Sequence, residues 1–124
     1  MRYIAIVFFA LISSAPSLAQ HSHGARGPSG GQMEDVAGVH AELVTAGHSI
    51  AFNILDEAGK PVRTNGFSGA VLVVNGSDRE TVTLAPSGEN VLKGDAKGAV
   101  ASGAAITLTI KTAEGKTGQA KFKK

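Results

Sequence analysis

The residues best suited to chemistry in this chain are its histidines. There are four, His21, His23, His40 and His48, and there is no cysteine. The lack of cysteine excludes thiolate metal sites, iron–sulfur clusters and cysteine nucleophiles, which leaves imidazole and carboxylate groups as the main metal ligands. Imidazole suits copper, nickel and zinc. The pattern therefore points to transition-metal binding, provided that several of these side chains come together.

The first 19 residues have the pattern of a cleaved secretory signal peptide. Arg2 precedes the apolar run Tyr3–Ile12, which at about ten residues fits the core of a signal peptide and is too short to span a bilayer. The small residues Ser17 and Ala19 suit the pockets of a signal peptidase. We therefore predict cleavage after Ala19, export to the periplasm and no membrane span in the mature protein.

Cleavage after Ala19 would place two histidines close to a free amine. Gln20 becomes the first residue, His21 the second and His23 the fourth. An α-amine, a deprotonated amide and an imidazole form a nitrogen set that Cu(II) and Ni(II) prefer, and removal of Gln20 would move His23 to the third position. Two alternatives stay open: an amino-terminal glutamine can cyclise and lose its amine, and a short histidine-bearing tail can be a plain polar linker.

A second set of candidate ligands accompanies the predicted strand Val39–Thr45. His40 and Glu42 are two residues apart and project from the same face of that strand, where they can share a divalent ion or form a surface hydrogen-bonded pair. Met33 offers a thioether for Cu(I) or serves as core filler. His48 falls in a predicted turn, which favours a solvated side chain. The candidate metal ligands are His21, His23, Met33, His40 and Glu42.

Motifs for catalysis and for phosphate binding are missing from the sequence. Ser68 and Ser87 stand in turn-like contexts rather than in Gly-x-Ser-x-Gly. The segment 24–31 is glycine-rich but lacks the Gly-Lys-Ser/Thr ending of a phosphate loop. The near balance of 12 basic and 10 acidic residues, with few aromatic residues, argues against nucleic acid as a partner. We therefore predict that the protein is not an enzyme.

Three of the last four residues of the sequence are lysines, Lys121, Lys123 and Lys124. Such residues are typical of a solvated terminus that keeps an edge strand soluble. The alternative is an electrostatic contact with anionic lipid or with an acidic partner. Both interpretations fit the sequence.

The elements that must position these residues are predicted to be β-strands. Sixteen glycines with abundant valine, threonine and alanine indicate strands and tight turns, and no segment combines helical periodicity with capping signals. The strand-like runs are Val39–Thr45, Ser49–Leu55, Pro61–Arg63, Ser68–Asn75, Arg79–Ala85, Val91–Lys93, Ala104–Thr112 and Thr117–Phe122. About seven strands at this spacing predict an antiparallel immunoglobulin-like β-sandwich, with a small barrel as the alternative. The predicted organisation is a signal peptide over 1–19, a flexible segment containing Gly and His over 20–35, and the β-sandwich domain over 36–124.

Two segments of the chain resemble a known group of proteins. Residues 27–44 contain Gly-Pro-Ser-Gly-Gly, a spacer and His-Ala-Glu-Leu-Val, and residues 56–62 read Asp-Glu-Ala-Gly-Lys-Pro-Val. The arrangement is similar to that of small bacterial periplasmic proteins, and of β domains of some efflux adaptor subunits, associated with heavy-metal and copper handling. The resemblance implies an exported β domain and points to Gly30, Gly31, His40 and Glu42. The variable position of the pattern, often His or Asn in that group, is Ser29 here, which removes one potential ligand.

Two functions from different classes follow from the sequence. The first is a periplasmic module that binds or buffers a transition metal, with copper favoured, through His21 and His23 with help from His40. The second is a non-catalytic module that pairs with an envelope protein, such as a metal-efflux component, through an exposed edge strand, its histidines being incidental. A tail carrying His21 and His23 within reach of His40 favours the first function.

Overall fold

The computed structural model describes residues 25–124, which form an all-β fold of antiparallel strands. The predicted signal peptide and the candidate ligands His21 and His23 lie outside the described residues. Residues 25–124 contain no α-helix, and therefore none that could cross a membrane. The strands are β1 (Met33–Val36), β2 (Val39–Ala46), β3 (Ser49–Leu55), β4 (Ser68–Asn75), β5 (Asp78–Pro86), β6 (Val91–Asp95), β7 (Ala105–Lys111) and β8 (Thr117–Lys123).

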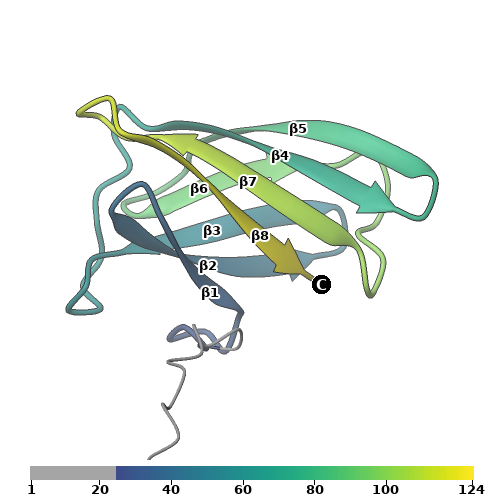
Figure 1. Ribbon diagram of the computed structural model, residues 1–124, viewed down its shortest axis with the longest axis horizontal. Coiled ribbons are helices and arrows are strands. Elements are labelled where there is room, and N and C mark those ends of the chain that lie inside the picture. Colours follow the sequence, from purple (N-terminus) through teal and green to yellow (C-terminus); the bar gives the residue numbers. More distant parts are fainter. Residues whose placement is uncertain (1–24) are drawn as a thin grey trace, which may run out of the picture.

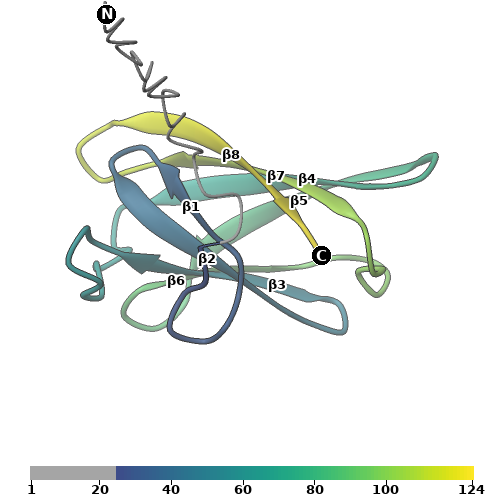
Figure 2. The same cartoon turned by 60° about the horizontal axis from the view of Figure 1, so that its bottom comes forward.

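The eight strands follow one another in a single sheet in the order β1-β2-β3-β6-β5-β4-β7-β8 (Figure 1). The connection between its two halves is narrow, because β5 and β6 pair only through Ala85 with Lys93 and Pro86 with Leu92. At this point the sheet folds over. Figure 2 shows β4, β5, β7 and β8 on one side of the molecule and β3 and β6 on the other.

The sheet curls until its first and last strands meet. A Cβ added to Gly118 of β8 would stand 2.7 Å from the backbone nitrogen of Ala37, just after β1. At the other end of β8, the backbone N–H of Lys123 donates a hydrogen bond of 3.0 Å to Oε1 of Gln32. Since β1 and β8 are not neighbours in the hydrogen-bonded ladder, the sheet is barrel-like and nearly closed.

The prediction of an all-β antiparallel fold is confirmed, and two of its details differ. The strands number eight rather than about seven. The strand β1 begins within the segment 20–35 that was predicted to be flexible, whereas Pro61–Arg63 contributes only an isolated bridge from Leu55 to Pro61. The seven-stranded sandwich gives way to a nearly closed sheet because β5 pairs with β6 and β8 returns to β1. The small barrel, the alternative from sequence, is the nearer description.

Alternation of side chains along the strands builds the interior. In β7, Ile106, Leu108 and Ile110 are buried while Ala105 and Thr109 are exposed, the two-residue period of a strand with one face inward. The rings of Phe52 in β3 and Phe122 in β8 lie 5.2 Å apart between centroids and are tilted by 59°, which joins the two halves of the sheet. The buried apolar cluster comprises Val36, Ala41, Leu43, Ile50, Phe52, Ile54, Phe67, Val71, Val73, Val82, Leu84, Leu92, Ala96, Val100, Ala104, Ile106, Leu108, Ile110, Ala120 and Phe122.

Two-residue turns join two of the hairpins where the sequence predicts turns. Gly47 and His48 connect β2 to β3, and Gly76 and Ser77 connect β4 to β5. The φ angles of Gly47 and Gly76 are 58° and 63°, in the left-handed region that such turns require and that glycine adopts without steric cost. His48 is therefore held at an exposed tip.

Candidate functional site

The predicted ligands that the structure describes lie on the outer face of the β1–β2 hairpin. Met33 stands directly opposite Glu42, and Asp35 stands directly opposite His40. Opposed residues project to the same side of a sheet, and this side faces away from the core because the intervening Ala41 is buried in it. The hairpin therefore brings Met33, His40 and Glu42 to one face and adds Asp35 to them.

Glu42 is fully buried although it projects from this outer face, because a loop covers it. Its Oε2 atom accepts the backbone N–H groups of Ser29 at 2.8 Å and Gly31 at 3.0 Å. Its Oε1 atom accepts a hydrogen bond of 3.1 Å from Nδ2 of Asn53 in β3. A buried carboxylate needs partners of this kind, since burial without them is strongly unfavourable. In this arrangement Glu42 anchors the loop, and both of its oxygens are occupied by protein donors.

The loop that covers Glu42, residues 27–31, is held by its own backbone as well; we call it the carboxylate loop. The N–H of Gly27 donates to the carbonyl of Gly31, and the N–H of Gly30 donates to the carbonyl of Gly27, both at 2.9 Å. A Cβ on Gly27 would lie 2.3 Å from Cδ of Glu42, and one on Gly31 would lie 2.1 Å from the carbonyl oxygen of Leu43. The backbone can approach the carboxylate this closely only where side chains are absent.

This geometry explains the Gly-Pro-Ser-Gly-Gly pattern in physical terms. Ser29 binds Glu42 through its backbone N–H, a group that every residue except proline carries. The variable position of the pattern therefore contributes to the anchor whatever its side chain. The segment 20–35, predicted to be flexible, ends in a hydrogen-bonded loop and a strand: Met33 donates its N–H to the carbonyl of Ala25, and Leu43 donates to that of Gln32, each at 2.9 Å.

His40 is paired with Asp35 and not with Glu42. Nδ1 of His40 contacts Oδ1 of Asp35 across the β1–β2 ladder. The His40 side chain is 24% exposed and that of Asp35 is 83% exposed, so the pair is open to solvent. With Gly38, Val39 and Glu57, the pair lines a small pocket of about 160 Å³. The arrangement presents one imidazole and one carboxylate to a cation.

The described residues of this face supply only part of a metal site. Within residues 25–124, His, Asp and Glu side chains form no group of three or more that could hold an ion. Met33 is half-buried opposite the occupied Glu42. His48 lies at the tip of the β2–β3 hairpin, where its Nδ1 atom stands 3.1 Å from the carbonyl oxygen of Lys97. Among the described residues, the His40–Asp35 pair therefore offers a cation two side chains.

We expect Gly31→Ala to detach the carboxylate loop. The new Cβ would meet a backbone carbonyl at 2.1 Å, so the loop must move and lose its hydrogen bonds to Glu42. The expected cost is about 2 kcal/mol of unfolding free energy, as is usual for overpacking, measured by urea denaturation. Ser29→Ala is the matched control, because it keeps the backbone N–H that binds Glu42. Equal stability of the two variants would contradict the role given to Gly31.

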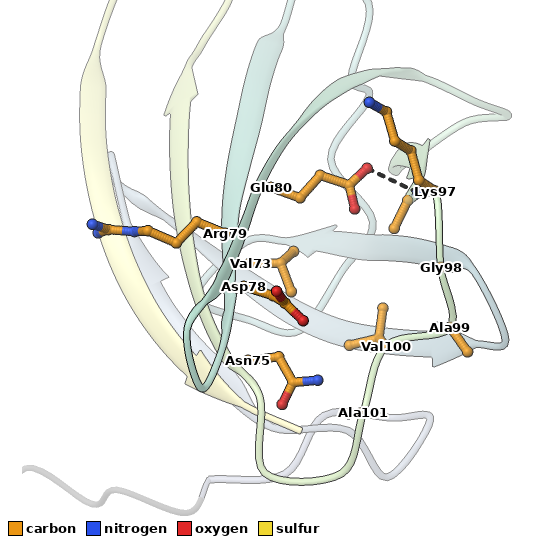
Figure 3. A pocket seen from close by; sticks show the side chains of 11 residues that line it. Val73, Asn75, Asp78, Arg79, Glu80, Lys97, Gly98, Ala99, Val100 and Ala101 are labelled. Carbon is orange, nitrogen blue, oxygen red and sulfur yellow. Dashed lines mark hydrogen bonds between the residues drawn. The ribbon is translucent and has the colours of Figure 1, made fainter.

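A second concavity lies between the β4–β5 hairpin and residues 96–101 (Figure 3). Its volume is about 310 Å³. Asp78 and Glu80 project toward it while Arg79 points away (Figure 3), and Oε1 of Glu80 accepts the backbone N–H of Lys97 at 2.8 Å. This contact closes the 96–101 segment onto β5. The sequence pattern did not single out these residues.

Asp35 and Asn53 are candidate functional residues that the sequence pattern missed as well. Asp35 is a candidate because it stands opposite His40 in the ladder. That position follows only if residues 33–36 form a strand. The available signal was the dipeptide Ala37-Gly38, whose φ angles of 50° and 83° let the chain reverse between β1 and β2. A turn placed there predicts the pairing of Asp35 with His40 directly.

Comparison of the chain with known protein families, with curated proteins and with solved structures gives no match.

Proposed function

We propose that the protein is an exported, periplasmic, non-catalytic module that binds or buffers a divalent transition metal, with copper favoured. The observation that carries the proposal is the His40–Asp35 pair, which is open to solvent on the face of β1–β2. Imidazole nitrogen suits copper and zinc, and the contact of Asp35 with Nδ1 orients the His40 ring. We assign His21 and His23, which precede Met33 at the start of β1 by 12 and 10 residues in the sequence, as the ligands that complete the set.

The length of the chain supports this assignment. The carbonyl of Ala25 accepts the N–H of Met33, so residue 25 lies beside the start of β1. His23 precedes Ala25 by two residues, a span of at most about 7 Å, and Asp35 follows Met33 by two residues, about 6.6 Å along a strand. The chain length thus keeps His23 within about 7 Å of Ala25, close to the hairpin that carries the His40–Asp35 pair. We propose that metal is held by His40 and His23, with His21 or the terminal amine completing a nitrogen-rich set.

Calorimetric titration with Cu(II) and Zn(II) tests this proposal on protein that the host has processed, with its first residue identified by mass spectrometry. We expect a Cu(II) Kd of the order of 1 μM or tighter. The His21→Ala/His23→Ala variant should bind at least about 100-fold more weakly, and Asp35→Asn about 10-fold more weakly, as is typical of a residue that orients a ligating histidine.

His48→Ala is the matched control, because the His48 side chain is exposed and lies next to the Lys97 carbonyl, away from the His40–Asp35 pair. Its Kd should equal that of the unmodified protein. Binding that is unchanged in the His21→Ala/His23→Ala variant, or weakened equally by His48→Ala, would contradict the proposal.

Pairing with an envelope protein through an exposed edge strand is the second candidate function. The structure offers it less support, because the two terminal strands that would supply such edges, β1 and β8, lie against each other. An added strand would have to separate them.

A further inference from the structure

Four neighbouring strands present an outer surface without any acidic side chain; we call it the basic face. It consists of the outward-pointing residues of β4 (even numbers 68–74), β5 (odd numbers 79–85), β7 (odd numbers 105–111) and β8 (odd numbers 117–123). Most of the residues that alternate with them are buried in the core. The four strands are adjacent in the sheet and form one side of the molecule (Figure 2). The basic face therefore is one continuous surface.

The charges of this surface are all of one sign. Its charged residues are Arg79, Lys111, Lys121 and Lys123, whereas all 10 acidic residues of the chain lie elsewhere. The nearest acids by sequence, Asp78 and Glu80, lie on the opposite side of β5, and Figure 3 shows them pointing away from Arg79. A chain close to neutral thus carries a strongly polarised charge distribution that only the fold creates.

Three of the cations gather at one end of the basic face. In the register of the sheet, Arg79 lies opposite Val74, Val74 opposite Ala105, and Ala105 opposite Lys123. Lys121 occupies the next row, in line with Thr107. Arg79 and Lys123 therefore stand at the two ends of this row, three strand spacings or about 14 Å apart, a distance that suits contacts with separate anions.

The centre of the basic face is aliphatic and hydroxylic. Leu72 and Val74 are half-buried, and threonines at 81, 83, 107 and 109 flank β4 on both sides. No aromatic side chain projects from the face, and the aromatic anchors that dominate tight protein interfaces are therefore missing from it. Spread cations on an extended surface are instead what binds a layer of anionic headgroups.

We propose that the basic face docks the protein peripherally on a bilayer that contains anionic phospholipid. Arg79, Lys121 and Lys123 contact headgroup phosphates, and the threonine hydroxyls donate further hydrogen bonds to phosphate oxygens. The binding is electrostatic and reversible, with each cation contributing about fivefold to the affinity. This inference is independent of the proposed metal site, which lies on β1 and β2.

Co-sedimentation with lipid vesicles tests the inference on the full processed protein. We expect binding to vesicles of phosphatidylglycerol and phosphatidylcholine at about 0.01 M ionic strength, strong weakening at about 0.15 M, and none to phosphatidylcholine alone. The variant Arg79→Glu/Lys121→Glu/Lys123→Glu should bind at least about 100-fold more weakly, since three contributions are lost. Metal affinity should stay unchanged in this variant.

The matched control reverses three exposed cations outside the basic face, Lys60→Glu/Arg63→Glu/Lys93→Glu, and so changes the net charge by the same amount. It should keep most of the vesicle binding. An equal loss of vesicle binding in both variants would show that only net charge matters, and would overturn the proposal. Stronger binding to soluble poly-glutamate than to vesicles would overturn it as well. If the triple glutamate variant of the basic face has a much lower Tm than the unmodified protein, the milder Arg79→Ala/Lys121→Ala/Lys123→Ala variant replaces it. This variant should also bind vesicles more weakly than the control variant does.

Discussion

Glu42→Leu is expected to lower the free energy of unfolding by about 3 kcal/mol, within the range for buried donors that lose their acceptor. The carboxylate accepts three hydrogen bonds, from the backbone of Ser29 and Gly31 and from the side chain of Asn53. Leucine fills the space but accepts none of them. The carboxylate loop must then either keep unpaired donors against the sheet or swing into water, and both outcomes destabilise the fold.

Glu42→Gln should cost less, about 1 kcal/mol. The glutamine oxygen can accept the two backbone N–H groups, and the Asn53 amide can turn so that its oxygen accepts from the new NH₂ group. Glu57→Gln, at an exposed position in the turn after β3, serves as the control and should change little. Urea denaturation gives the free energies, and hydrogen exchange at the amides of Ser29 and Gly31 reports the loop. A Glu42→Leu protein as stable as the unmodified one would show that the anchor is unimportant.

Among glycine-to-alanine substitutions in the strands, Gly94→Ala is expected to destabilise the fold most. A Cβ there would stand 2.5 Å from the carbonyl oxygen of Thr83 and 2.8 Å from Cγ1 of Val82. Gly94 pairs with Ile50 of β3 and lies against β5 where the sheet folds over, so its missing side chain makes room for the corner. The nearest atom belongs to the backbone, which cannot rotate away.

The expected cost of Gly94→Ala is about 3 kcal/mol, the upper range for overpacking, or on the order of 10–20 °C in Tm for a domain of this size. Gly98→Ala is the control, because a Cβ on Gly98 meets nothing within 4 Å and its φ is not positive. It should be neutral or slightly stabilising. Thermal unfolding followed by circular dichroism measures both, and equal Tm values would mean that β5 and β6 do not meet as closely as described.

The strands could be predicted where side-chain alternation is strong. Ile106, Leu108 and Ile110 mark β7, and Ile50, Phe52 and Ile54 mark β3, since one face of each strand enters the core. β1 escaped prediction because Met33, Glu34 and Asp35 have no apolar alternation. Its place is determined by the turn at Gly38 and by pairing with β2. Pro61–Arg63 looked like a strand but only bridges, because proline lacks the N–H that a ladder needs.

The roles of the candidate ligands depended on contacts that sequence spacing does not report. The separation of two between His40 and Glu42 correctly predicts that both project from one face of β2. It does not reveal that the carboxylate loop covers Glu42, or that Asp35 reaches His40, because both contacts come from β1 and the residues before it. A residue on an outer face became buried through backbone donors 11 to 13 positions away.

The sequence by itself determined the β character of the domain, the positions of most strands and turns, and the types of metal ligand available, because these follow from local alternation, glycine and composition. The tertiary structure alone decided that Glu42 is an anchor, that Asp35 is the partner of His40, and that the cations of three strands share a face without acids. The physical reason is the same in each case. Side chains distant in the sequence meet only when the sheet register and its closure place them, and hydrogen bonds and charges act over such short distances.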